Sequence, residues 1–221
     1  MSAVGGAPSL PVVEPPSVPS WRLLATLGGA GALAGLLIVL VYGWTRPRIE
    51  AHRAQVLHDA IEEVLHAPAR ADTLFLSGGS LTAALAAGVD RSKLERIYLG
   101  YDSAGRPAGY AIVASEPGFQ DQVELIFGYD PATRQVLGMK ILESKETPGL
   151  GDRIEKPAFG EQFAGRQAPL EGVKGSAPPD DPNAVVMITG ATISSRTVIR
   201  EMNAAIERWQ PIIEAYRPGS N

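Results

Sequence analysis

The feature that most constrains this chain is an uncharged apolar run at residues 23–44, LLATLGGAGALAGLLIVLVYGW. As a helix that rises 1.5 Å per residue, the run would be about 33 Å long, which matches the roughly 30 Å hydrocarbon core of a bilayer. Arg22 precedes the run, and Trp44 and Arg46 end it, as expected for anchors at the membrane interfaces. A cleaved signal peptide has a shorter apolar region followed by a small-residue cleavage site. We therefore predict an uncleaved transmembrane helix at residues 22–46.

This span divides the chain into four predicted parts: an N-terminal tail at residues 1–21, the transmembrane helix at 22–46, a membrane-proximal helical stalk at 47–68, and one domain at 69–221. The stalk is predicted because apolar residues between Arg48 and Leu65 recur at a spacing of three to four. Pro68 then ends the pattern.

Charges around the span predict an orientation. The tail contains no Lys or Arg before Arg22, whereas Arg46 and Arg48 follow the apolar run. The positive-inside rule therefore puts the large C-terminal part in the cytoplasm. Within the span, Gly31 and Gly35 form a GxxxG pair, which favours close approach of a second membrane helix.

Composition excludes several kinds of chemistry. The 221 residues include no cysteine, which excludes disulfides, thiolate-ligated zinc, iron–sulfur clusters and a cysteine nucleophile. The net charge of -4 gives no basic footprint for nucleic acid. His52, His58 and His66 do not have the i, i+4 spacing that puts two metal ligands on one helix face, so we interpret them as solvated polar residues. If the chain handles electrons, an organic cofactor must carry them.

The region after the predicted stalk favours an α+β fold, with helices packed on an antiparallel sheet. Strands are predicted at 94–101, 108–114, 122–129 and 136–142, joined by turns at 102–105 and 130–133. A short strand at 184–188 and a long helix at 195–216 follow, after a surface loop at 176–183. Leu76–Ser80 is glycine-rich, but the chain has no GxxxxGK sequence, so an ordinary loop is predicted instead of a P-loop.

Residues 187–198, MITGATISSRTV, carry more hydroxyl groups than a helix start needs. A helix that begins near Ser194 would leave its first amide N–H groups without partners, and with the helix dipole these form a site for phosphate. Gly190 allows close approach of a ligand to the backbone, and Thr192 would stand immediately before the helix. Taken alone, the stretch is more typical of a strand-to-helix turn with spare N-cap residues, because Ser and Thr are preferred caps.

A second stretch, ESKETPGLGDRI at residues 143–154, follows the predicted strand at 136–142. Thr147–Gly151 reads as a tight loop with exposed backbone, on which a flat ring could lie close to amide groups. Taken alone, this stretch is better explained as a plain turn between a strand and a helix.

Together, and in this order after a single membrane helix, the two stretches resemble the FMN-binding domain family. They are most similar to the G subunits of Rnf-type ion-translocating electron transport complexes, with the related C subunits of sodium-translocating NADH:quinone reductases as the alternative. The resemblance implies an FMN attached covalently, through its phosphate, to Thr192. The family's remaining flavin-binding positions correspond here to Thr189, Gly190, Ala191, Ile193 and Ser194, and to Glu146, Thr147, Pro148, Gly149, Leu150 and Gly151. The family commonly has an acidic residue where this chain has Val186, which would slow attachment if the flavin transferase reads that acid.

The resemblance also implies a role and a location. The chain would be a membrane-anchored flavoprotein that relays electrons, with the other membrane subunits of its complex and a flavin transferase as partners. It would be a single-pass protein of the bacterial inner membrane. Family members place the flavin domain on the periplasmic side, and we follow the family against the charge rule.

Two other functions have to be compared on the residues themselves. A cofactor-free binding or scaffold module remains the alternative from another class, because turns such as 189–192 often only cap helices. A hydrolase built on Glu124, Glu143 and Glu146 is disfavoured, because no nucleophile and base accompany these carboxylates. No catalytic residue is therefore expected, and the flavin would carry the redox chemistry.

Overall fold

The computed structural model describes residues 19–85, 88–177 and 180–217. Most of the predicted N-terminal tail, residues 1–18, lies outside the described residues, as do residues 178 and 179 of the predicted surface loop. The described residues of that loop contain no helix or strand before β8 begins at Ala184. The chain divides into two compact units, Met1–His52 and Arg53–Asn221.

The first unit contains most of the long helix α1 (Ser20–Val64), which has 45 residues and includes Pro47. Its most apolar window has a mean hydropathy of 2.3, and none of that window is buried. The helix is therefore long and apolar enough to cross a membrane. The helical pattern expected between Arg48 and Leu65 is confirmed as far as Val64.

The second unit is built on a six-stranded antiparallel sheet in the order β2-β1-β3-β4-β5-β6. Its strands are β1 (Arg70–Ser77), β2 (Ser80–Thr82), β3 (Arg96–Tyr101), β4 (Pro107–Pro117), β5 (Gln122–Asp130) and β6 (Gln135–Glu143). The four predicted strands from β3 to β6 are confirmed. The loop predicted at Leu76–Ser80 is too long. Strand β1 extends to Ser77 and β2 begins at Ser80, so only Gly78 and Gly79 form the turn between them. Both have positive φ, +60° and +83°, which glycine adopts without strain.

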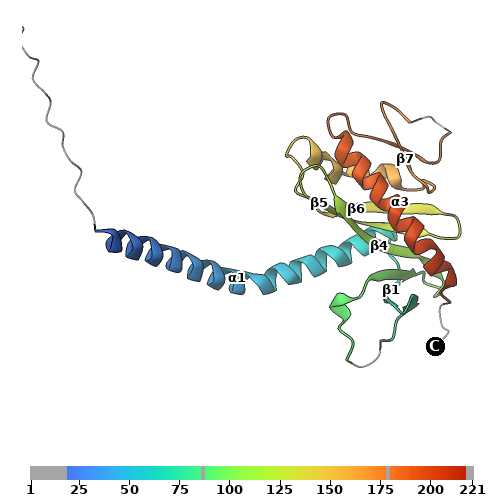
Figure 1. Ribbon diagram of the computed structural model, residues 1–221. Helices are drawn as coiled ribbons and strands as arrows, with labels where there is room; N and C mark the ends of the chain where they lie inside the picture. Colours follow the sequence, from blue (N-terminus) through green and yellow to red (C-terminus); the bar gives the residue numbers. More distant parts are fainter. Residues whose placement is uncertain (1–18, 86–87, 178–179, 218–221) are drawn as a thin grey trace, which may run out of the picture. The chain divides into compact units, whose positions relative to one another are not determined.

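Successive side chains along each strand point to opposite faces of the sheet, and both faces carry apolar residues. On one face, Val123, Leu125 and Phe127 are fully buried in the main core with residues of α3 (Thr192–Ala215), and α3 lies across this face (Figure 1). Ile126 points to the other face and packs with the C-terminal end of α1, including Val64.

A glycine permits the close contact on this second face. A Cβ at Gly128 would lie 2.1 Å from the carbonyl oxygen of Val64, a distance at which any side chain would push the end of α1 off the sheet. The end of α1 and β5 can therefore pack directly against each other.

Short elements complete the second unit: η1 (Arg91–Lys93), η2 (Gly151–Glu155), α2 (Pro157–Gly160), η3 (Glu161–Phe163), and β7 (Glu171–Val173), which pairs in parallel with β8 (Ala184–Val186). The strand predicted at 184–188 is therefore two residues shorter than expected. Helix α3 runs through Pro211 and ends at Ala215. The α+β class, with an antiparallel sheet, packed helices and an N-terminal apolar helix, is confirmed.

Candidate functional site

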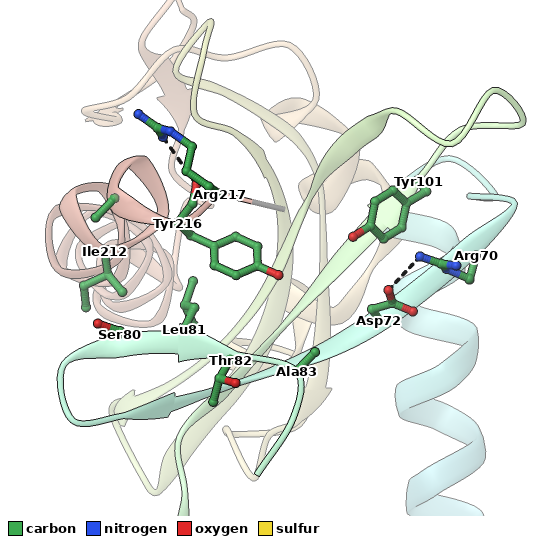
Figure 2. A pocket seen from close by; sticks show the side chains of 11 residues that line it. Arg70, Asp72, Ser80, Leu81, Thr82, Ala83, Tyr101, Ile212, Tyr216 and Arg217 are labelled. Atoms are coloured by element: carbon green, nitrogen blue, oxygen red, sulfur yellow. Dashed lines mark hydrogen bonds and ion pairs between the residues drawn. The ribbon is translucent and has the colours of Figure 1, made fainter. Parts of the chain in front are cut away.

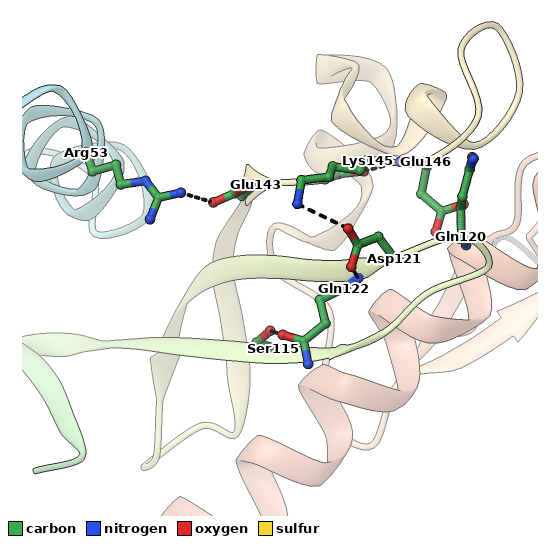
Figure 3. Close-up of polar contacts among 9 residues, drawn as sticks. Arg53, Ser115, Gln120, Asp121, Gln122, Glu143, Lys145 and Glu146 are labelled. Atoms are coloured by element: carbon green, nitrogen blue, oxygen red, sulfur yellow. Dashed lines mark hydrogen bonds and ion pairs between the residues drawn. The ribbon is translucent and has the colours of Figure 1, made fainter. Parts of the chain in front are cut away.

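Three segments that are distant in sequence meet at the N-terminus of α3. They are the turn between β4 and β5 at residues 118–121, the loop after β6 at residues 144–150, and the turn before α3 at residues 187–191. The side chain of Glu146 hydrogen bonds to the first of these segments and to α3 itself, and Figure 3 shows it beside Gln120. The two motif stretches singled out in the sequence therefore lie together.

Helix α3 begins at Thr192, two residues earlier than the predicted start near Ser194. Ala191 is the N-cap residue and makes no side-chain capping bond. The N–H of Ser195 donates to the carbonyl oxygen of Ala191 at 2.9 Å, so the amides of Thr192, Ile193 and Ser194 precede the first bond within the helix. No acceptor for these three amides occurs among the residues that the structure describes. The spare-cap interpretation is wrong, because no hydroxyl caps this helix.

The two serines of the motif have structural roles. The hydroxyl of Ser194 donates to Oε2 of Glu146 at 2.9 Å. The hydroxyl of Ser195 donates to the carbonyl oxygen of Ala191 at 2.9 Å and accepts from the N–H of Ile188 at 3.1 Å. Both serines are buried. Their side chains therefore bind the turn to the helix and are not available to a ligand.

The two threonines differ from the serines. Thr192 is half-buried in the first turn of α3, and Thr189 is exposed. Within residues 19–85, 88–177 and 180–217, neither threonine hydroxyl has a hydrogen-bond partner. Of these two, only Thr192 belongs to the first helical turn, beside the free amides. Among the described residues of the motif, its hydroxyl is therefore the one side-chain hydroxyl that is both unengaged and next to the helix N-terminus.

The approach to this turn is open and carries a positive charge. Gly190 has φ +89°, and a Cβ there would meet only Cδ2 of Leu150, at 3.5 Å. The guanidinium of Arg153, which is exposed, donates to the carbonyl oxygen of Thr189 at 3.2 Å. A cation next to unpaired amides at a helix N-terminus favours an anionic group such as phosphate.

The loop after β6 has an exposed half and a packed half. Pro148, Gly149 and Leu150 are exposed, and Gly149 has φ +79° with open space around it. The hydroxyl of Thr147 donates to Oε1 of Gln120 at 3.1 Å. Gly151 is buried, and a Cβ there would lie 2.6 Å from Oε2 of Glu146. The exposed half can therefore meet a ligand, while Gly151 serves the packing below it.

The structure also brings two residues to this place that the sequence reasoning missed. Arg153 lies within the second stretch but was not among the residues assigned to the site. Phe119 lies in the β4–β5 turn and is 64% exposed, like the nearby Leu150 (51%) and Ile193 (53%). A large aromatic residue in the polar turn SEPGFQDQ, between two alternating strands, is the signal that could have identified Phe119.

These features fit the group that the family resemblance implies. The free amides and Arg153 suit the phosphate of FMN, the hydroxyl of Thr192 stands where an ester could form, and the exposed apolar side chains suit a flat ring. A cavity of about 480 Å³ lies elsewhere, between β1, β2, β3 and the C-terminal end of α3. Tyr101 and Tyr216 line it (Figure 2), and it contains none of the predicted site residues.

Comparison with known proteins bears on both the domain and the whole chain. The FMN-binding domain family model matches residues 118–207, which include all three segments of the site. The G subunit of the ion-translocating oxidoreductase complex of Methanosarcina acetivorans is 27% identical over 186 residues, covering 84% of this chain and 92% of that protein. The protein of the same name from Pseudomonas aeruginosa is 30% identical over 190 residues, covering 82% and 85%.

The fold has a solved counterpart. The crystal structure of NqrC from Shewanella oneidensis aligns with a TM-score of 0.65 at 16% identity, covering 75% of this chain and 100% of that chain. This likeness shows the fold, and the relatives above extend over most of the sequence. The chain therefore belongs to the family of G subunits of ion-translocating oxidoreductase complexes and contains its FMN-binding domain.

Proposed function

We propose that this chain is the flavoprotein subunit of an Rnf-type ion-translocating oxidoreductase complex and carries FMN as a phosphoester on Thr192. The observation that supports this most strongly is the sorting of hydroxyl groups at the start of α3. Ser194 and Ser195 are bound within the fold, whereas the Thr192 hydroxyl is unengaged beside three amides without described acceptors. The subunit would relay electrons within the complex and have no independent turnover.

Different residues of the site would bind different parts of the cofactor. The amides of the first turn of α3 and the guanidinium of Arg153 would stabilise the phosphate. Gly190, which has positive φ and open space, would let the phosphate approach the backbone. Leu150 and Ile193 would pack against the ring system and exclude water from it. When bound, FMN supplies the redox chemistry, so no side chain of this site needs to act as an acid or base.

We also propose how the chain is arranged at the membrane. Residues 22–46 of α1 would span the bacterial inner membrane, residues 47–68 would form the connecting stalk, and the domain at 69–221 would lie in the periplasm. The exposed apolar surface of α1 supports the span. The other membrane subunits of the complex would pack around it, and a flavin transferase would attach the cofactor.

Two alternatives remain to be compared. The FMN subunit of a sodium-translocating NADH:quinone reductase is favoured by the fold of NqrC, but the relatives that cover most of this chain are G subunits. A cofactor-free anchor module would require the free amides and the exposed apolar residues to serve a protein partner instead. An Rnf-type flavoprotein accounts for both observations with one ligand.

A gel separates the flavoprotein from the cofactor-free module. The full chain is produced with a flavin transferase, denatured and run beside a Thr192→Ala variant and a Thr189→Ala variant. We expect ultraviolet fluorescence in the wild-type band, none for Thr192→Ala, and some for Thr189→Ala. A dark wild-type band, with the transferase shown to be active on another substrate, would leave the anchor module as the better account.

A further inference from the structure

We propose that the β4–β5 turn, Gly118–Asp121, is a third wall of the flavin site, in which Phe119 contacts the ring system and Glu146 is the positioning residue that holds the turn in place. Neither motif stretch contains this turn. The inference rests on the proposed function, because it assigns residues to the same FMN.

Glu146 joins the turn to the helix that would carry the cofactor. It is only 5% exposed. Its Oε1 accepts from the N–H of Phe119 at 2.7 Å and from the N–H of Gln120 at 3.2 Å. Its Oε2 accepts from the hydroxyl of Ser194 at 2.9 Å. Both oxygens are thus engaged by the protein, and charge-assisted bonds of this kind are stronger than neutral ones. Glu146 therefore acts on a ligand through other residues.

The carboxylate also has almost no freedom to move. A Cβ at Gly118 would lie 2.2 Å from its Oε1, and a Cβ at Gly151 would lie 2.6 Å from its Oε2. Any larger residue at either position would displace the carboxylate or the backbone around it. The turn, the loop after β6 and the first turn of α3 are therefore held in one fixed arrangement around Glu146.

This arrangement presents an apolar surface to solvent. Phe119 is bonded to Glu146 through its own amide. Leu150 precedes Gly151, which packs on Glu146, and Ile193 precedes Ser194, which bonds to it. All three side chains are more than half exposed, although burial of apolar surface is favourable. Ile193 carries one of the free amides of α3, and the segments of Phe119 and Leu150 are joined to the same turn through Glu146. This arrangement points to the ring system of the same FMN as their cover, with Phe119 supplying an aromatic contact.

The test compares flavin-loaded full chains purified in detergent: wild type, Phe119→Ala and Phe119→Trp. Loss of the ring removes an aromatic contact and opens the flavin to water, so Phe119→Ala should shift the flavin potential and its visible circular dichroism. Phe119→Trp keeps an aromatic ring and should bring the potential and the dichroism back toward the wild-type values. The mass added at Thr192 should stay the same in all three chains, because Phe119 takes no part in the ester.

The role of Glu146 is tested with a matched carboxylate. Glu143 lies three residues earlier and forms an exposed ion pair with Arg53 (Figure 3), so Glu143→Ala should leave the flavin signals unchanged. Glu146→Ala should reproduce the Phe119→Ala signals. Glu146→Gln should give a smaller change, because its carbonyl oxygen can still accept from the N–H of Phe119 and it is the variant better able to fold.

The outcomes separate this inference from the function on which it rests. Wild-type dichroism and potential in loaded Phe119→Ala would overturn the inference while leaving the flavoprotein intact. The inference would also be overturned if the only effect of Phe119→Ala were that other subunits no longer copurify with the chain. That result would identify the surface as a protein contact. A wild-type chain that carries no flavin would instead refute the proposed function.

Discussion

Replacing Glu201 by Gln should stabilise the domain at neutral and alkaline pH. Glu201 lies on α3, is 1% exposed, and has no hydrogen-bond partner for either carboxylate oxygen among the described residues. Burial raises the pKa of Glu201 from 4.5 to about 8, and the nearby carboxylates of Glu116 on β4 and Glu124 on β5 contribute to this rise, against the opposing effect of Arg200. The folded domain therefore keeps a proton there at neutral pH.

The raised pKa sets the sign and the window of the effect. Between pH 4.5 and about 8, the unfolded chain has lost a proton that the folded chain retains. The free energy of unfolding therefore decreases as pH rises through this window. One pKa unit corresponds to about 1.4 kcal/mol, so the whole shift from 4.5 to about 8 is worth about 5 kcal/mol. Gln has a similar shape and does not ionise, so this loss should be absent in the variant.

The assay is thermal unfolding of the full chain in detergent at pH 5, 7 and 9, followed by circular dichroism. For a domain of this size, 1 kcal/mol shifts the melting temperature by about 2–4 °C. We expect the melting temperature of the variant to exceed that of the wild type by roughly 10–20 °C at pH 9, with only a small difference at pH 5. Glu207→Gln, an exposed position on the same helix, is the control. A difference that does not grow with pH would refute the assignment of a buried, unpaired carboxyl.

Two further predictions concern the flavin-side loop and the membrane topology. Gly149→Val should shift the flavin spectrum and potential, because valine is strained at φ +79°. Gly151→Val should shift both by displacing the carboxylate of Glu146. Unaltered spectra and potentials in both variants would identify the loop as an ordinary turn. Alkaline phosphatase fused after Asn221 should be active and green fluorescent protein at the same place dark, whereas the reverse pattern would support the cytoplasmic orientation that Arg46 and Arg48 favour.

The parts of the fold that could be predicted from the sequence are those in which buried residues recur at a regular spacing along the chain. Val123, Leu125 and Phe127 alternate along β5, and all three are fully buried. Strand β1 was missed because its first half, Arg70–Thr73, is polar or small and contains no buried residue, so its pairing with β3 decides its structure. Tertiary contacts override local preference in such segments.

The site was predictable only in part, for a similar reason. The motif residues could be named from sequence, but Glu146 bonds to Phe119 across 27 residues and to Ser194 across 48. Such contacts depend on how the turn, the loop and α3 come together, which no local pattern contains. The start of α3 at Thr192 was also missed, because Ser194 bonds to Glu146 and does not cap the helix.

The most direct test of the central claim is peptide mass mapping of the full chain produced with an active flavin transferase. The account predicts that the peptide containing Thr192 carries the mass of one FMN less one water. Thr192→Ala should lack this mass and remain folded, because Ala191 and not Thr192 is the N-cap of α3. Ser194→Ala should retain at least part of it. An unmodified wild-type peptide, or FMN mapped to another residue, would contradict the account.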